Sequence, residues 1–254
     1  MSVHPLSSPL AVDAVTQAKI QLAAAHRLAV FHDLEEGIDN HFTVTVPGRD
    51  DQYLILPFGR HWSEARASDM IVFDESGKTL EGEGDVELSA LCIHAPIHRV
   101  SGARVVMHTH QPWVLALNML KNNRLVPASQ SAAHLQGRIV YDDNYAGNAD
   151  TLAEGERLAQ LLDGKPIMFM KNHGVLVTGD TIAQAYKRLY FLERVCRTQV
   201  LAMGSGQPME IIPDDIVAKV QTPPANDRHR GKRDQMFFDA LMRVLDRELP
   251  GYAD

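Results

Sequence analysis

Two histidines, His108 and His110, stand one residue apart at the end of an apolar run that begins at Val105. On a β-strand, residues two apart point to the same side, so both imidazoles can reach one metal ion. A third histidine, His173, lies downstream in an Asn-His-Gly turn. Histidine is the commonest neutral metal ligand, and three protein ligands with an open position are typical of catalytic sites. The pattern indicates a metal site; strand histidines that face solvent or pack together are the structural alternative.

Composition limits the class of protein. The chain has 254 residues, 45% of them hydrophobic and 22% charged, which is ordinary for a globular protein with a sizeable core. A formal net charge of −7 argues against a nucleic-acid partner. The basic cluster at residues 228–233 is interpreted as a solvated connector, with a phosphate or partner patch as the alternative.

The N-terminus has no basic start followed by an apolar core, and no run approaches the roughly 20 apolar residues of a membrane span. We therefore expect no membrane partner and a cytoplasmic location. Two cysteines, Cys92 and Cys196, fall in apolar helical patterns and are predicted to be buried small hydrophobes.

Hydrophobic periodicity predicts alternating helices and short strands. Helices are expected over 13–33, 87–98, about 112–120, 150–162 and from Thr181 to a stop at Gly204; strands are expected over 42–46, 53–56, 71–73, 105–110, 139–141, 167–170 and 175–177. Pro96 lies late in the second helix and should bend or end it.

These elements predict one α/β domain with a mostly antiparallel sheet over residues 1–204. Residues 205–254 are expected to form a C-terminal extension that packs on the same domain or on a neighbouring subunit. That extension ends in a short helix around 234–247, and a disordered tail is the default expectation for Tyr252.

Several short motifs occur in a fixed order along the chain. They are Asn40-His41-Phe42-Thr43, Leu56-Pro57-Phe58-Gly59, Ala67-Ser68-Asp69, Val106-Met107-His108-Thr109-His110, Gly137-Arg138, Asn172-His173-Gly174 and Tyr190-Phe191-Leu192-Glu193-Arg194. With these motifs the chain resembles the class II aldolase/adducin family, in its bacterial adducin-like branch, from about residue 15 to the end. The two histidine motifs are the specific ones, and the others are individually weak.

The resemblance implies a three-layer α/β/α domain around a mostly antiparallel sheet, usually a homotetramer with active sites at subunit interfaces. It also implies that His108, His110 and His173 hold a divalent metal ion. Zinc is expected first, with manganese or iron as alternatives. Such an ion acts as a Lewis acid that polarises a carbonyl and neutralises an enediolate, which serves retro-aldol cleavage, epimerisation or decarboxylation equally.

The chain departs from the sugar-phosphate aldolases of this family at two places. Their acid/base glutamate is replaced by Ala90, and Glu87, one helical turn earlier, is the candidate that could reach the same region. A surface carboxylate at a helix N-terminus is the alternative for Glu87. The phosphate-binding segments now carry Asp39 and Phe58, which disfavours a phosphate dianion. We therefore expect a small non-phosphorylated carbonyl or hydroxy acid as substrate.

Further candidates are individually less specific. His41 and Tyr141 join Glu87 as groups that could move a proton, and the substrate pocket is predicted to include Asn40, Phe58, Gly59 and His61. For His94 a supporting or packing role is favoured, and for His98 none.

Three functions follow. The first is a metal-dependent lyase that breaks a C–C bond next to a carbonyl by retro-aldol cleavage or decarboxylation. The second uses the same three-histidine site as a non-haem Fe(II) oxygenase or oxidative decarboxylase, because the missing glutamate leaves more open positions. The third is a non-catalytic, adducin-like binding module.

Overall fold

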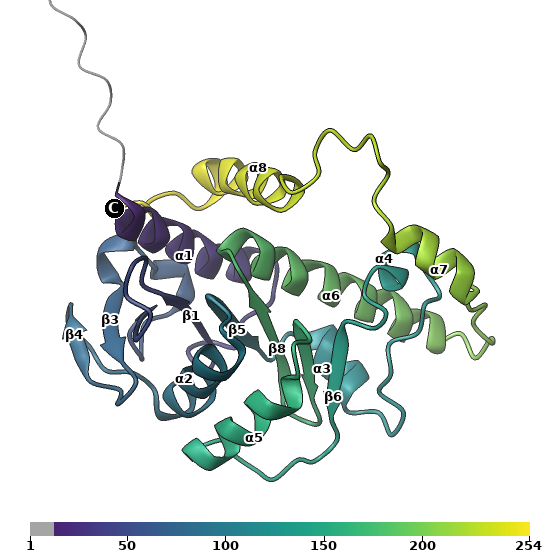
Figure 1. Cartoon of the computed structure of the whole chain (residues 1–254), viewed down its shortest axis with the longest axis horizontal. Coiled ribbons are helices and arrows are strands. Elements are labelled where there is room, and N and C mark those ends of the chain that lie inside the picture. Colours follow the sequence, from purple (N-terminus) through teal and green to yellow (C-terminus); the bar gives the residue numbers. More distant parts are fainter. Residues whose placement is uncertain (1–12) are drawn as a thin grey trace, which may run out of the picture.

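The computed structural model describes residues 13–254, which form an eight-stranded sheet with helices on both faces (Figure 1). The strand order is β4-β3-β2-β1-β5-β8-β7-β6, and every neighbouring pair is antiparallel except β6 with β7. The strands are β1 (His41–Thr45), β2 (Gln52–Ile55), β3 (Ile71–Asp74), β4 (Thr79–Glu81), β5 (Val105–Thr109), β6 (Ile139–Asp142), β7 (Ile167–Met170) and β8 (Gly174–Gly179). The helices are α1 (Ala14–Phe31), α2 (Leu88–Ser101), α3 (Pro112–Asn118), α4 (Gln130–Ala133), α5 (Leu152–Leu162), α6 (Ile182–Met203), α7 (Asp214–Gln221) and α8 (Arg233–Glu248), with 3₁₀ turns η1 (Trp62–Glu64) and η2 (Ala67–Asp69).

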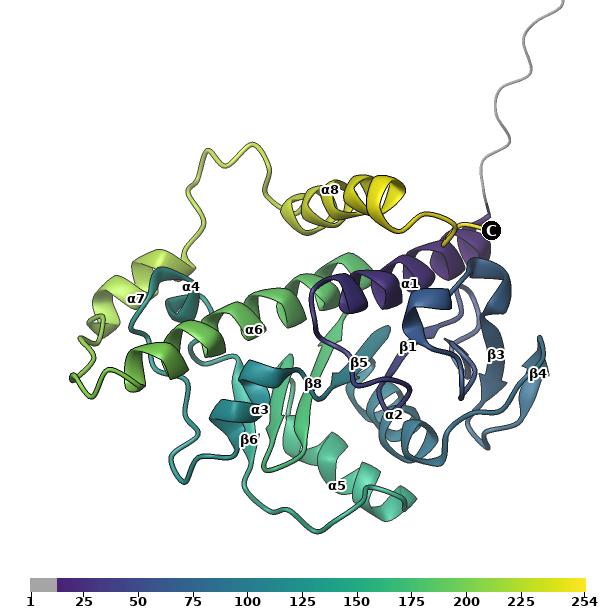
Figure 2. The same ribbon diagram turned by 180° about the vertical axis from the view of Figure 1, so that it is seen from behind.

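Helices α1 and α6 cover one face of the sheet, and α2 and α5 cover the other (Figures 1 and 2). The predicted three-layer α/β/α domain around a mostly antiparallel sheet is therefore confirmed. Both cysteines are free and buried, as predicted. Within residues 13–254, no helix combines the length and the apolar character needed to cross a bilayer.

Successive side chains along β1 point alternately to the helical layer of α1 and α6 and to the layer of α2 and α5. Phe42 and Val44 join the large core under α1 and α6, whereas Thr43 points to the opposite face and bonds side chains of α2. All five residues of β1 are buried. The α2 face of β1 is consequently a buried polar surface, and it starts at His41, which pairs with His108 of β5.

Helix α2 corrects one part of an expectation, because Pro96 does not end it. It runs on through Pro96 to Ser101 and ends at Gly102, which has a left-handed conformation with φ of 67°. A proline inside a helix removes a hydrogen bond and crowds the carbonyl four residues earlier, here that of Cys92. Helix α5 presents Gly155 at this point, where a Cβ would lie 1.8 Å from the Cys92 oxygen and 2.9 Å from Pro96 Cγ. The tight packing of α5 on α2 stabilises the helix where the local rule predicts its end.

The segment after residue 204 carries two helices, of which the sequence predicted only α8. Helix α8 packs against α6 and α1, and α7 contacts α4. The tail is ordered: Tyr252 is buried, its hydroxyl donates to Asp246 at 2.7 Å, and its carbonyl accepts from the Ala67 amide at 2.9 Å. The expectation of a disordered tail at Tyr252 is therefore wrong, because these bonds and the clamp of Arg27 on the Leu249, Pro250 and Gly251 carbonyls hold it against α1 and the 3₁₀ turns. The division of the chain at residue 204 stays a prediction.

Candidate metal centre

The structure brings His108, His110 and His173 together. Strand β5 ends between the first two histidines, and β8 pairs with β5 over Val105 to Thr109, so the turn between β7 and β8 carries His173 to the same place. One ring nitrogen from each histidine lies within 4.8 Å of the others. The ring centroids are 4.7–5.0 Å apart. The three imidazoles thus form a compact donor set of the kind that binds zinc and related divalent ions.

Hydrogen bonds fix which nitrogen of two rings faces the centre. His108 Nδ1 lies 3.0 Å from the Val175 carbonyl, and His110 Nδ1 contacts the Glu36 carboxylate. Since a carbonyl or carboxylate oxygen only accepts, both Nδ1 atoms carry the hydrogen. The two Nε2 atoms face each other at 3.0 Å. A carbonyl or carboxylate behind a ligand histidine is the usual arrangement at metal sites, and it leaves both Nε2 lone pairs for an ion.

The electrostatics favour neutral rings, which is the form that binds metal. Burial holds the pKa of His108 well below its ordinary value, and the neighbouring His173 and His41 add to the shift. Burial likewise lowers the pKa of His173 to about 4, with a further contribution from His110. At neutral pH these two imidazoles therefore offer lone pairs and no competing proton.

Backbone conformation and close packing explain why Asn172 and Gly174 stand on either side of His173. Asn172 has φ of 56°, a left-handed conformation that asparagine adopts more readily than most residues. A Cβ on Gly174 would lie 2.5 Å from the Thr109 oxygen and 2.8 Å from His110 Cδ2, so only glycine permits this approach. The side-chain amide of Asn118 donates to the carbonyls of Met170 and Gly174 and so holds both ends of the turn.

A small hollow of about 10 Å³ lies between α1, the end of β2 and the start of α2, and it is lined by none of the three histidines. Its lining residues are His26, Ile38, Asn40, His41, Ile55, Leu56, Pro57, Phe58, Gly59, Arg60, Trp62 and Glu87. His41 stacks on His108 with ring centroids 5.0 Å apart, and Asn40 accepts from the His110 amide at 3.2 Å. The hollow is therefore joined to the metal centre through these two residues.

Most of the residues predicted for the pocket and for proton transfer line this hollow. Asn40, Phe58, Gly59, His41 and Glu87 all line it. His61 does not line it: its ring lies 2.8 Å from the Ser63 hydroxyl, accepts the Ser63 amide and caps η1.

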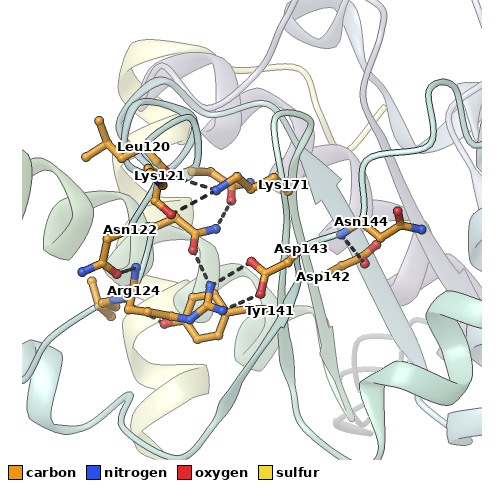
Figure 3. A network of polar contacts seen from close by, with 12 residues as sticks. Leu120, Lys121, Asn122, Arg124, Tyr141, Asp142, Asp143, Asn144 and Lys171 are labelled. Carbon is orange, nitrogen blue, oxygen red and sulfur yellow. Dashed lines mark hydrogen bonds and ion pairs between the residues drawn. The ribbon is translucent and has the colours of Figure 1, made fainter.

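Tyr141 is placed elsewhere. Its hydroxyl accepts from the Leu125 amide at 3.0 Å, and the guanidinium of Arg124 lies 4.2 Å from its ring centre. Figure 3 shows this network, in which Arg124 also pairs with Asp143 and Lys171 donates to the Leu120 carbonyl. In the described structure Tyr141 thus braces the loop before α4, and its polar contacts include no imidazole of the metal centre.

Two acidic residues near the site, Glu36 and Glu193, were not predicted from the sequence as site residues. Glu36 lies in the loop after α1, 74 positions from its partner His110. Glu193 of α6 accepts from the amides of Trp113 and Val114 at 2.9 and 3.1 Å, which fixes α3 directly after His110. Burial raises the pKa of Glu193 to about 7, although those two amides oppose the shift. Glu193 belongs to the Tyr-Phe-Leu-Glu-Arg motif, whereas nothing local marks Glu36.

Replacing Glu36 with alanine should weaken metal binding by about 10- to 100-fold, the usual cost of losing a carboxylate behind a ligand histidine. Zinc affinity measured by competition with a chromogenic chelator checks this. Glu83, an exposed carboxylate outside the site, provides the charge-matched control as Glu83→Ala. Equal zinc affinity in Glu36→Ala, Glu83→Ala and the unmodified protein would contradict a role for Glu36.

Known proteins resemble this chain over most of its length. Residues 20–200 match the family model described as Class II Aldolase and Adducin N-terminal domain. The crystal structure of an aldolase II superfamily protein from Pseudomonas syringae is 31% identical, with a TM-score of 0.88 over 96% of this chain and 98% of its own. Decarboxylase NovR of Streptomyces niveus is 30% identical over 80% of this chain and 77% of its own. A protein of Streptomyces roseochromogenus named 4-hydroxy-3-prenylphenylpyruvate oxygenase/4-hydroxy-3-prenylbenzoate synthase is 29% identical over 82% of this chain and 77% of its own.

Proposed function

The chain belongs to the class II aldolase and adducin family, and on this premise we propose that it is a metal-dependent lyase for a small non-phosphorylated carbonyl or hydroxy acid. The observation that carries the proposal is the convergence of His108, His110 and His173. Hydrogen bonds behind the rings of His108 and His110 leave their Nε2 lone pairs free for an ion. A divalent ion held there, zinc first and manganese or iron as alternatives, supplies a Lewis acid for a substrate carbonyl.

The residues that line the hollow define what the chain itself would contribute to the reaction. Glu87 and His41 line the hollow and are the groups proposed to hold and move protons there, in place of the family glutamate that is Ala90 here. Arg60, at the same hollow and 3.5 Å from Asp69, is the cation proposed to meet a substrate carboxylate. Leu56, Pro57 and Phe58 give the wall no side-chain donor for a phosphate group, which supports a non-phosphorylated substrate.

An Fe(II)-dependent oxygenase is the second candidate. The similarity to the Streptomyces oxygenase favours it, as does a site with three neutral ligands and no glutamate at position 90. A non-catalytic adducin-like module is the third candidate, and it gives no physical reason for three imidazoles to keep converging on one point. The homotetramer and the cytoplasmic location stay predictions.

The test is a substrate screen on protein purified anaerobically and loaded separately with zinc, manganese or ferrous iron. The panel contains non-phosphorylated 2-oxo and hydroxy acids, including arylpyruvates, with L-fuculose 1-phosphate as the phosphorylated control. Aldehyde or carbon dioxide released without oxygen supports the lyase. Product formed only with iron and oxygen supports the oxygenase. Absence of turnover with every metal contradicts both enzymes and supports the non-catalytic binding module.

A further inference from the structure

A row of hydrogen-bonded side chains leads from the metal centre into the interface between β1 and α2. It consists of His41 and Thr43 on β1 and His94 and His98 on α2, all four buried. His41 Nδ1 lies 2.7 Å from His94 Nε2, and the Thr43 hydroxyl lies 2.6 Å from His94 Nδ1 and 2.8 Å from His98 Nε2. His98 Nδ1 closes the row, 2.6 Å from the carbonyl of Ala103.

The far end of the row determines the direction of every bond in it. A carbonyl only accepts, so the hydrogen lies on His98 Nδ1 and, in a neutral ring, His98 Nε2 carries a lone pair. The Thr43 hydroxyl therefore donates to His98 Nε2 and accepts from His94 Nδ1. His94 Nε2 is then an acceptor, and His41 Nδ1 donates to it. Burial supports neutral rings, since it lowers the pKa of His98 to about 4 and that of His94 well below its ordinary value.

We infer that His98, Thr43 and His94 are positioning residues that hold His41 in its Nδ1–H tautomer, with the Nε2 lone pair turned to Ser89 at the hollow. Ser89 Oγ lies 3.2 Å from this nitrogen. From the sequence alone no role was expected for His98 and only a supporting or packing role for His94. His94 contacts His41 directly, and His98 is linked to His94 through Thr43 of another element, β1.

The fixed tautomer has a consequence for the substrate. The Ser89 hydroxyl has one hydrogen and two neighbours that accept it, His41 Nε2 and Glu87 Oε1, the latter at 2.7 Å. A carboxylate only accepts, so within this group of three one acceptor receives no hydrogen from the other two. A hydroxyl group brought by the ligand supplies the missing hydrogen. The site thus selects hydroxy acids over their deoxy analogues; this consequence rests on the proposed function, whereas the tautomer does not.

The tautomer is tested by ¹⁵N NMR of the histidine rings in the zinc-loaded full chain, with His41 assigned by the signals lost in His41→Gln. We expect a hydrogen on Nδ1 and a bare Nε2 in the unmodified protein and in Thr43→Ser. In Thr43→Val the row is cut: His94 is free to move its hydrogen to Nε2 and donate to His41 Nδ1, so His41 shifts to the Nε2–H tautomer. A bare Nδ1 in the unmodified protein, or an unchanged His41 tautomer in Thr43→Val, overturns the inference.

The ligand preference is tested by calorimetry with hydroxypyruvate and pyruvate, which differ by one hydroxyl group. The unmodified protein and Thr43→Ser should bind hydroxypyruvate roughly tenfold more tightly, as one net hydrogen bond provides, and Thr43→Val and Ser89→Ala should lose that preference. If Thr43→Val keeps the same preference for hydroxypyruvate as the unmodified protein, the link between the row and the ligand is overturned. If neither acid binds to any form, the proposed substrate class fails, while the NMR result still decides the tautomer.

Discussion

Replacing His173 with alanine is expected to remove stoichiometric metal from the purified protein and to lower zinc affinity by about 10³-fold or more. Three imidazoles share the binding free energy, and zinc sites with full ligand sets bind with about 10–16 kcal/mol, so the loss of one ligand removes several kcal/mol. Any metal-dependent turnover should fall to the level of the metal-stripped protein. Elemental analysis after anaerobic purification, followed by zinc titration against a chelator, measures both effects.

His173 is a cleaner position for this test than His108. The His108 ring is 1% exposed and donates to the Val175 carbonyl, so its removal costs packing and a buried hydrogen bond as well as a ligand. His173 lies in a turn and is only partly buried. The matched control is His134→Ala, which removes an exposed histidine outside the cluster. Retention of stoichiometric metal by His173→Ala, at unchanged affinity, would refute the three-histidine site.

Part of this site could be predicted from local rules. The alternation of side chains along a strand is enough to place His108 and His110 on one side, and β5 has this conformation up to Thr109. The position of His173 depends on the pairing of β8 with β5, which is a non-local contact. No local pattern predicts that contact, so the third ligand could be assigned only through the family resemblance.

The parts that were missed depend on tertiary contacts or on weak signals. Glu36 reaches His110 across 74 positions, and an exposed loop acid has no pattern that predicts such a partner. Pro96 is a helix breaker by local rules, yet α2 continues because Gly155 lets α5 pack against it. Helix α7 is different: Pro213, with Asp214 and Asp215 in the first turn, gave a usable start signal that its short apolar pattern did not reinforce.

Acid should unfold the metal-stripped protein between about pH 6.5 and pH 4, because several buried histidines must take up protons. Burial lowers the pKa of His26 to about 4 and that of His98 to about 4. In the unfolded chain these rings titrate near pH 6.5, so between the two values the unfolded state binds more protons and the free energy of unfolding falls as the pH falls. The stabilisation is complete above about pH 6.5 and lost as the pH approaches 4.

At about 1.4 kcal/mol per pKa unit, each of these two rings accounts for roughly 3 kcal/mol, a large share of the usual 5–15 kcal/mol of a domain. Urea unfolding followed by circular dichroism at pH 7.5, 6 and 5 measures the effect. His26→Phe should flatten the curve by about 2 kcal/mol between pH 7.5 and pH 5, the part of the effect that falls in this range. The ring centroid of His26 lies 4.9 Å from that of Phe42 and 4.7 Å from that of Trp62, and phenylalanine suits the same contacts. His229→Ala, at an exposed position, should leave the curve unchanged. An unfolding free energy that stays constant from pH 7.5 to 5 would contradict this prediction. It would mean that these rings are already protonated in the folded state or take up protons without unfolding.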